Sequence, residues 1–182
     1  MVNILSPKQI KDLFFHREDV FARQLDKGMY FPVKRPVTIE DIKLHLKGKI
    51  TLGAYCLRQD NTVRWCCVDI DIHGEVNSES LWKVKKEAIK IYLLFDDLPR
   101  ILEYSGRRGY HVWILFKTPM NALYAQSLMK ARLNRVGLNK HEIFPKQTEL
   151  NEGRLYGNLV KIPLATHRVS GKKSVILQME GL

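Results

Sequence analysis

The chain has 182 residues, of which 45% are hydrophobic and 27% charged, so it can bury a core and is unlike a disordered segment. Its formal charge of +11 and isoelectric point near 9.6 favour a polyanionic partner, either nucleic acid or an anionic membrane surface. No apolar stretch approaches the roughly 20 residues that span a bilayer, and the N-terminus lacks the order of a signal peptide. We therefore expect a cytoplasmic protein with no membrane partner.

Two helices are predicted in the first third of the chain. Residues 7–27 carry apolar side chains at roughly helical spacing. The residues that mark the ends of this helix are the N-cap Ser6, Pro7 at the first helical position and the terminating Gly28. A second, shorter helix is expected over residues 38–46, with Thr38 as its cap.

A strand pair is expected next, over residues 50–57 and 63–72, because β-branched and aromatic residues dominate both segments. This region also holds all three cysteines of the chain, Cys56, Cys66 and Cys67. An odd number without C-x-x-C spacing, two of them adjacent on a strand and thus on opposite faces, does not suit one metal. Buried free thiols in a reducing compartment are the prediction.

The rest of the chain alternates helices and strands. The expected elements are a helix over 78–95, a hairpin of 101–105 and 110–116, a helix over 120–136, strands over 141–144 and 158–162, and a tail hairpin at 170–171. This order indicates an α+β fold with an RRM-like (RNA-recognition-motif-like) antiparallel or mixed sheet flanked by helices. We expect one domain over residues 1–182, with a small N-terminal α/β lobe over about 1–62 and a core over about 63–182.

Two acids alternate along the strand predicted at residues 63–72. Asp69 and Asp71 are one residue apart, so their side chains leave the same face. Two like charges at this spacing repel unless a cation lies between them, and hard divalent ions prefer oxygen ligands. Alone, such a pair is more often a solvated face of an antiparallel strand than a metal site.

The loop of the predicted hairpin, residues 105–111, is rich in glycine and arginine. Gly106 and Gly109 allow the backbone to approach a ligand closely, while Arg107 and Arg108 offer forked donors that match phosphate oxygens. His111 begins the returning strand. Each of these features also occurs in solvated hairpins without function. They indicate a functional site only in combination with the acid pair.

Taken together, these segments resemble the archaeo-eukaryotic primase superfamily, whose members carry an hhhDhD motif, a second motif close to S-G-x-x-G-x-H and a third acid on a later strand. Residues 65–71 match the first motif, and residues 105–113 match the second. Residues 142–147 and 157–167 are similar to the third motif and the following basic strand of the branch associated with CRISPR loci and TOTE conflict systems. Similarity to that branch extends over about residues 14–167.

The resemblance implies a DNA primase and polymerase that makes primers and extends them from ribo- or deoxyribonucleoside triphosphates, with two Mg²⁺ or Mn²⁺ ions. It implies Asp69, Asp71 and Glu142 as catalytic metal ligands. Glu142 stands where many members carry aspartate, and Glu149 is the alternative third acid. The residues implied to bind the nucleotide are Ser105, Arg107, Arg108, His111, Asn158, Lys161 and His167.

The implied partners are a single-stranded DNA template and its primer, together with a C-terminal helical primase domain or CRISPR and conflict-system proteins outside this chain. The remaining basic residues are available to track template phosphates or are solvated, including Lys8, Lys11, Arg17, Arg23, Lys34, Arg35, Lys43, Lys47, Lys49, Lys83, Lys85, Lys86 and Lys90. The main alternative function is a non-catalytic RRM-like nucleic-acid-binding module, which requires aromatic side chains on the open face of its sheet. A metal-dependent nuclease or glycosyltransferase using the two aspartates is a further alternative.

Overall fold

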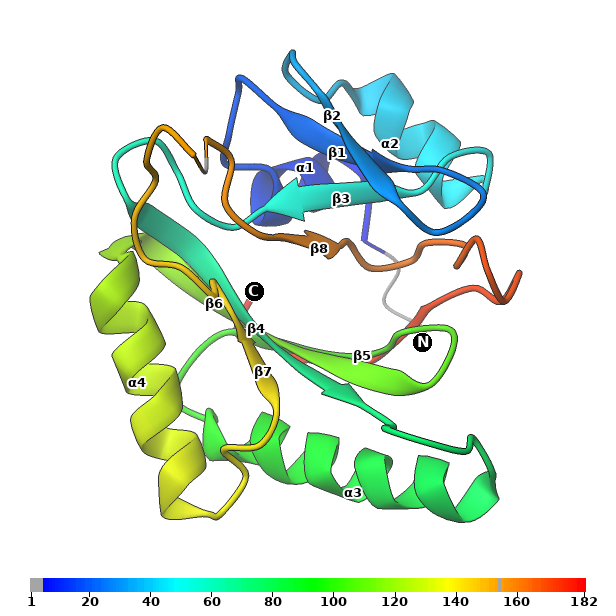
Figure 1. Ribbon diagram of the computed structural model, residues 1–182, viewed down its shortest axis with the longest axis vertical. Helices are drawn as coiled ribbons and strands as arrows, with labels where there is room; N and C mark the ends of the chain where they lie inside the picture. Colours follow the sequence, from blue (N-terminus) through cyan, green and yellow to red (C-terminus); the bar gives the residue numbers. More distant parts are fainter. Residues whose placement is uncertain (1–4, 154) are drawn as a thin grey trace.

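The computed structural model describes residues 5–153 and 155–182, and in them two antiparallel sheets pack together (Figure 1). The four-stranded sheet has the order β2-β1-β3-β8, with strands Phe21–Gln24 (β1), Tyr30–Val33 (β2), Leu52–Tyr55 (β3) and Leu159–Lys161 (β8). The five-stranded sheet has the order β7-β4-β6-β5-β9, with strands Thr62–Asp71 (β4), Arg100–Tyr104 (β5), Gly109–Asn121 (β6), Glu142–Phe144 (β7) and Val175–Glu180 (β9). The predicted α+β class is confirmed.

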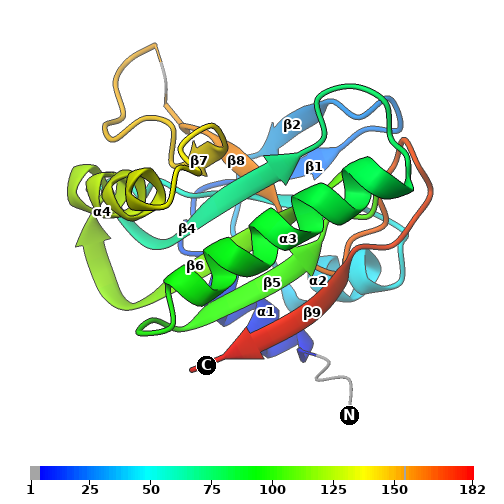
Figure 2. The same ribbon diagram turned by 90° about the horizontal axis from the view of Figure 1, so that it is seen from below.

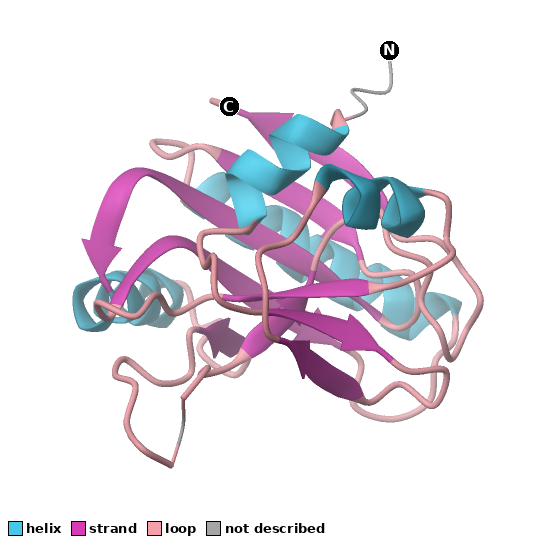
Figure 3. Ribbon diagram, turned by 90° about the horizontal axis from the view of Figure 1, so that it is seen from above, coloured by secondary structure: helices cyan, strands magenta, loops and turns pink. Residues whose placement is uncertain are grey.

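Helices of the described residues pack against the two sheets. The helices are Pro7–Phe14 (α1), Ile39–Leu46 (α2), Ser78–Leu94 (α3) and Ala122–Arg135 (α4). Figure 2 shows α3 lying across β4, β6 and β5, with α4 beside it. The short helices α1 and α2 lie side by side near the four-stranded sheet (Figure 3). None of the described helices is long and apolar enough to cross a bilayer.

Successive side chains of β4 point to opposite faces of the sheet, and the buried ones therefore belong to two separate layers of the core. Cys66, Val68 and Ile70 are buried against α3 and α4. Trp65 and Cys67 are buried on the other face, where they pack toward α1 and the four-stranded sheet. All three cysteines are free and buried, as predicted. Because both faces of this sheet are covered at its centre, some of its polar residues are buried, among them Glu103 and His111.

The first predicted helix is too long. α1 begins at Pro7 with Ser6 as its N-cap, as predicted, but it ends at Phe14, and Phe21–Gln24 forms β1. β1 is a central strand, paired on one side with β2 and on the other with β3. Backbone pairing on two sides outweighs the weak helical spacing of this segment, since intrinsic propensity is easily overridden by tertiary context.

The predicted pairing of residues 50–57 with 63–72 is wrong. Both segments contain strands, but β3 belongs to the four-stranded sheet and β4 to the five-stranded sheet. The turn between them is tight, with Arg58 N–H donating to Thr62 O at 2.9 Å and Asn61 at a φ of 58°. The chain uses this turn to cross between sheets, and β3 pairs instead with β1 and with the distant β8.

The second half follows the prediction more closely. The helix Ser78–Leu94, the hairpin β5–β6, the helix α4 and the strands β7 and β8 are confirmed. α4 begins at Ala122 and not at 120, because β6 continues to Asn121 opposite Thr62. The tail hairpin forms through a bridge between Thr166 and Lys173. Strand β9, which follows it and pairs with β5, was not predicted.

Candidate active site

A cavity of about 320 Å³ lies between the two sheets and contains most of the predicted site residues. Eight of the ten line it: Asp69, Asp71, Ser105, Arg107, Arg108, His111, Lys161 and His167. They come from β4, the β5–β6 loop, β6, β8 and the segment after β8. The cavity therefore places acids from one sheet opposite basic groups from the loop and from the other sheet. Its volume is in the range of small-molecule sites.

Asp69 and Asp71 share one face of β4, as predicted, while Val68 and Ile70 point into the opposite core. Burial raises the pKa of Asp69, and the charges of Asp71 and Glu142 raise it further against the opposing effect of His111. Among the described residues, Asp69 Oδ1 is a buried oxygen with no hydrogen-bond partner. A buried carboxylate oxygen without a donor, beside a second carboxylate, is a setting that suits a hard divalent cation.

Both glycines of the loop have a structural reason to be glycine. Gly106 has a φ of +88°, a backbone conformation that residues other than glycine rarely adopt. Gly109 lies opposite Asp71 in the β4–β6 register, and a Cβ built on it would be 2.3 Å from Asp71 Oδ1. The sequence predicted a close approach of this loop to a ligand, whereas the contact that the structure shows at Gly109 is with Asp71.

The β5–β6 loop is held in place by backbone contacts. Tyr104 Oη donates to Arg107 O at 3.0 Å, and Ser170 Oγ donates to Gly106 O at 2.9 Å. Arg108 Nε donates to Asp71 Oδ2 at 2.8 Å, so this guanidinium neutralises the second aspartate of the pair. The exposed Arg107 lines the cavity beside it. The loop thus presents one arginine to the acid pair and one to the cavity.

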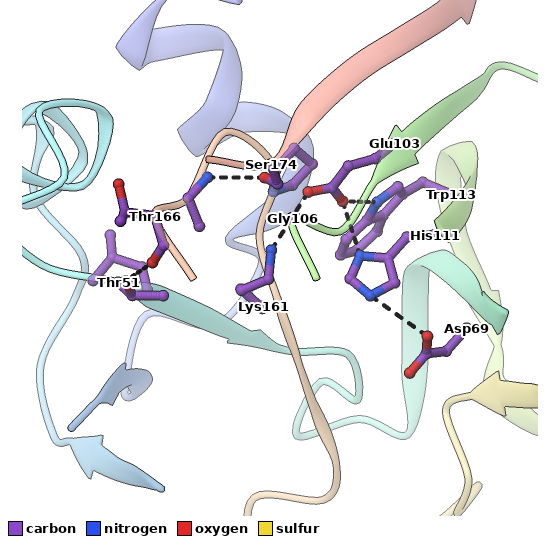
Figure 4. A network of polar contacts seen from close by, with 12 residues as sticks. Thr51, Asp69, Glu103, Gly106, His111, Trp113, Lys161, Thr166 and Ser174 are labelled. Atoms are coloured by element: carbon purple, nitrogen blue, oxygen red, sulfur yellow. Dashed lines mark hydrogen bonds and ion pairs between the residues drawn. The ribbon is translucent and has the colours of Figure 1, made fainter. Parts of the chain in front are cut away.

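A row of polar residues crosses four strands of the five-stranded sheet. In register, Glu142 of β7 lies opposite Asp69, Asp69 opposite His111 of β6, and His111 opposite Glu103 of β5. His111 Nδ1 lies 2.9 Å from Glu103 Oε2, and Nε2 lies 3.7 Å from Asp69 Oδ1 (Figure 4). Burial lowers the pKa of His111, but the charge and hydrogen bond of Glu103 and the charge of Asp69 together raise it above its usual value.

Lys161 and His167 enter the cavity from the opposite side. Lys161 Nζ lies 3.6 Å from Glu103 Oε1, and within the described residues it has no hydrogen-bond acceptor although only 9% of its side chain is exposed. Burial lowers the pKa of His167, as do the nearby charges of Lys161 and Arg107. A buried ammonium with unused donors and a cluster of cations around it favour an anionic ligand.

Two predicted residues lie outside this cavity. Glu142 is exposed and pairs with Lys146, whose Nζ lies 2.9 Å from Glu142 Oε2. Asn158 lines a neighbouring cavity of about 570 Å³ together with Tyr55 and Tyr156. Glu149, the alternative third acid, is also exposed. In residues 5–153 and 155–182 no group of three or more acidic, histidine or cysteine side chains is arranged to hold a metal, so the third ligand stays a prediction.

Glu103 is a buried acid of this region that sequence reasoning missed. It is fully buried between the apolar residues Leu102 and Tyr104, and it accepts from both His111 and Trp113. The sequence feature that could have indicated it is a single acid among the apolar residues of a predicted strand. Its partners are on another strand and another sheet, so nothing nearby in the sequence pointed to them.

Comparisons with known proteins find a matching family and a similar fold. The model of a family described as "TOTE conflict system, Archaeo-Eukaryotic Primase domain" matches residues 32–181. Among solved structures, the chain is similar to the AEP domain of the cyanophage S-2L primase-polymerase (PrimPol), with a TM-score of 0.55 and 12% identity over 90% of this chain and 82% of that chain. At this identity the likeness shows the fold alone. No curated protein matches the chain.

Proposed function

Because the chain belongs to the archaeo-eukaryotic primase domain family of TOTE conflict systems, we propose that it is a template-directed primase-polymerase. Family membership supports nucleotidyl transfer in general, with nucleic acid and nucleoside triphosphates as ligands. The finer proposal is synthesis and extension of primers on single-stranded DNA. The observation that carries it is the single cavity in which Asp69 and Asp71 face Arg107, His111 and Lys161.

Asp69 and Asp71 are the proposed holders of the divalent ions, Mg²⁺ or Mn²⁺. Their oxygens are hard ligands, and Asp69 Oδ1, which accepts no hydrogen bond among the described residues, lies 3.7 Å from His111 Nε2. When bound, such ions stabilise the charge that develops on the entering and departing oxygens of a phosphoryl transfer. Glu142, opposite Asp69 across β4 and β7, is the proposed third ligand once it leaves Lys146.

The basic residues of the cavity are proposed to hold the triphosphate. Arg107 supplies a forked donor from the loop, and Lys161 supplies a buried ammonium from β8. His111, with Nε2 on the cavity side, and His167 complete this set; Ser105 lines the same wall. Donors fixed by the protein before the substrate arrives stabilise developing negative charge without reorganisation. Asn158, in the adjoining cavity, is proposed to contact the rest of the nucleotide.

The alternative of a non-catalytic RRM-like binding module is less well supported. Such a module stacks bases on aromatic side chains of an open sheet face. Trp65 and Trp113 do lie on the relevant face, but both are completely buried, with Trp65 Nε1 donating to the backbone of Phe14 in α1 at 3.0 Å. The four-stranded sheet covers this face. Where the face borders the cavity, it carries Asp69 and Asp71, which repel a phosphate backbone.

A gel assay tests the proposal. Wild-type protein is incubated with primed and with unprimed single-stranded DNA, with each nucleotide set, in Mg²⁺ and in Mn²⁺. We expect extension that requires a divalent ion and is lost in the Asp69→Asn/Asp71→Asn double variant. Extension by that variant at the wild-type rate would refute the metal site. Binding of DNA without incorporation under every condition would favour the binding module.

A further inference from the structure

One carboxylate, that of Glu103, is completely buried at the meeting point of the two sheets. It belongs to β5, but its side chain contacts residues from β6 and from β8 of the other sheet (Figure 4). A buried carboxylate is unfavourable unless it is paired and hydrogen-bonded. Burial by itself raises the pKa of Glu103, but Lys161 and His111 bring it below its usual value, so Glu103 is a buried anion.

The first partner of Glu103 is His111. Glu103 Oε2 accepts from His111 Nδ1 at 2.9 Å and from Trp113 Nε1 at 3.0 Å. The Trp113 ring is itself immobilised, with its centroid 4.9 Å from that of Phe14 and 5.0 Å from that of Trp65. An acceptor at Nδ1 places the proton on that nitrogen and directs Nε2 into the cavity. Glu103 therefore sets the orientation of the histidine that faces Asp69.

The second partner is Lys161. Its Nζ lies 3.6 Å from Glu103 Oε1, an ion pair without a hydrogen bond, and within the described residues its three donors have no acceptor. The attraction holds the buried ammonium in the lining of the cavity, and its donors are not used by any acceptor in the described part of the chain. One carboxylate thus holds two cationic side chains from two different sheets at one position.

We propose that Glu103 is a positioning residue that holds His111 and Lys161 as a preformed receptor for a polyphosphate chain. The proposal rests on the proposed function in taking that chain to be the triphosphate of a nucleotide. It makes a prediction opposite to that of simple electrostatics. Removing a negative charge beside an anion site should strengthen anion binding, whereas loss of the positioning partner should weaken it.

The test measures binding of inorganic tripolyphosphate by calorimetry to the whole chain, without template. In Glu103→Gln, which is nearly isosteric, we expect binding to weaken about tenfold or more, the scale on which loss of an orienting partner acts at other sites. The KM for nucleotide should rise by a similar factor, with kcat and the Kd for template changing much less. Glu103→Asp, which keeps the charge but is shorter, should bind more tightly than Glu103→Gln and less tightly than wild type.

Glu87→Gln is the matched control. Glu87 also pairs with a lysine and a histidine, with Lys140 Nζ at 2.8 Å and His141 Nε2 at 2.9 Å, but it belongs to α3 on the far side of the sheet. Tripolyphosphate binding by Glu103→Gln equal to or tighter than that of wild type overturns the proposal, as does an equal loss in Glu87→Gln. If Glu103→Gln does not fold, Glu103→Asp decides on the same criteria. Wild type that binds tripolyphosphate but incorporates no nucleotide would refute the proposed function alone.

Discussion

Gly109 and Asp71 lie directly opposite each other on β6 and β4, and the Asp71 carboxylate occupies the space that a side chain at position 109 would need. The second glycine of the loop is thus part of the acid site. The two sequence motifs, one acidic and one rich in glycine and arginine, are adjacent because β4 and β6 pair, and the contact between Gly109 and Asp71 can be tested directly.

Gly109→Ala should displace Asp71. The added Cβ would meet both Asp71 Oδ1 and Ile70 O at 2.3 Å, so the strand has to shift, and we expect a loss of stability of about 1–3 kcal/mol. Nucleotide incorporation should fall more steeply than the folded fraction does. Gly153→Ala is the control, because its Cβ would lie 3.6 Å from its nearest neighbour, an ordinary contact. Equal activity of the two variants would contradict a role for the contact.

Asp69→Asn should abolish incorporation and yet leave the metal-free protein as stable as wild type or more so. Burial raises the pKa of Asp69, which means that its charged form is unfavourable when no cation is present. Thermal melting in EDTA and in Mg²⁺ measures both effects, with roughly 2–4 °C expected for each kcal/mol in a chain of this size. Wild type should gain stability from Mg²⁺ and Asp69→Asn should not. A Mg²⁺-induced shift of equal size in the variant would exclude Asp69 as a ligand.

Arg107→Ala should raise the KM for nucleotide by about tenfold or more while leaving the Kd for template nearly unchanged, because this guanidinium is assigned to the triphosphate. Steady-state kinetics and a fluorescence titration with labelled template measure the two constants. Arg35→Ala provides the comparison, since Arg35 is an exposed arginine that pairs with Asp41 away from the cavity. Weaker template binding with an unchanged KM would reassign Arg107 to the nucleic acid.

Template binding should depend steeply on salt, because a chain with a formal charge of +11 releases counterions when it neutralises phosphates. Lys172 lies in the exposed turn that touches the Arg107 loop through Ser170, whereas Lys86 lies on α3, on the opposite side of the five-stranded sheet. Lys172→Gln should reduce the slope of log K against log salt by about 0.7, the value for one phosphate of a single strand. Lys86→Gln should leave the slope unchanged, and the reverse result would move the template to the α3 face.

Stability should fall as the pH drops from about 6.5 to about 4, in part through His45. His45 is buried and uncharged, with Nε2 2.9 Å from Pro163 O and Nδ1 accepting from Leu52 N–H at 3.0 Å; burial lowers its pKa to about 4. As the pH falls, His45 is protonated in the unfolded chain before it is protonated in the folded protein. Its contribution to the free energy of unfolding is therefore fully present above the unfolded pKa near 6.5. That contribution is lost between about pH 6.5 and 4, by about 3 kcal/mol in all. Chemical denaturation of wild type and His45→Gln across this range measures it. If the free energy of unfolding depends on pH in the same way in both proteins, His45 is not the source of the effect.

Local patterns were sufficient for the parts of the fold that form from neighbouring residues. The capped helices α2 and α3, the hairpin β5–β6 and the shared face of Asp69 and Asp71 all depend on spacing within one segment. The motifs that carry the site chemistry are equally local. Eight of the ten predicted site residues line one cavity because the hairpin and β4 are paired neighbours and β8 faces them from the other sheet.

Long-range pairing decided the rest. The apolar residues of the β1 segment are compatible with a helix or with a strand. Residues 21–24 form a strand because β1 pairs with both β2 and β3. Likewise, β3 pairs with β8, more than 100 residues later, and no local signal marks that partner. This pairing brings Lys161 to Glu103 and closes the cavity. Residue spacing along the chain, together with the motif resemblance, was therefore enough to predict the acids and the arginine loop as a site, and these residues line one cavity. The buried carboxylate that links the two sheets depends on contacts that exist only once both sheets have formed.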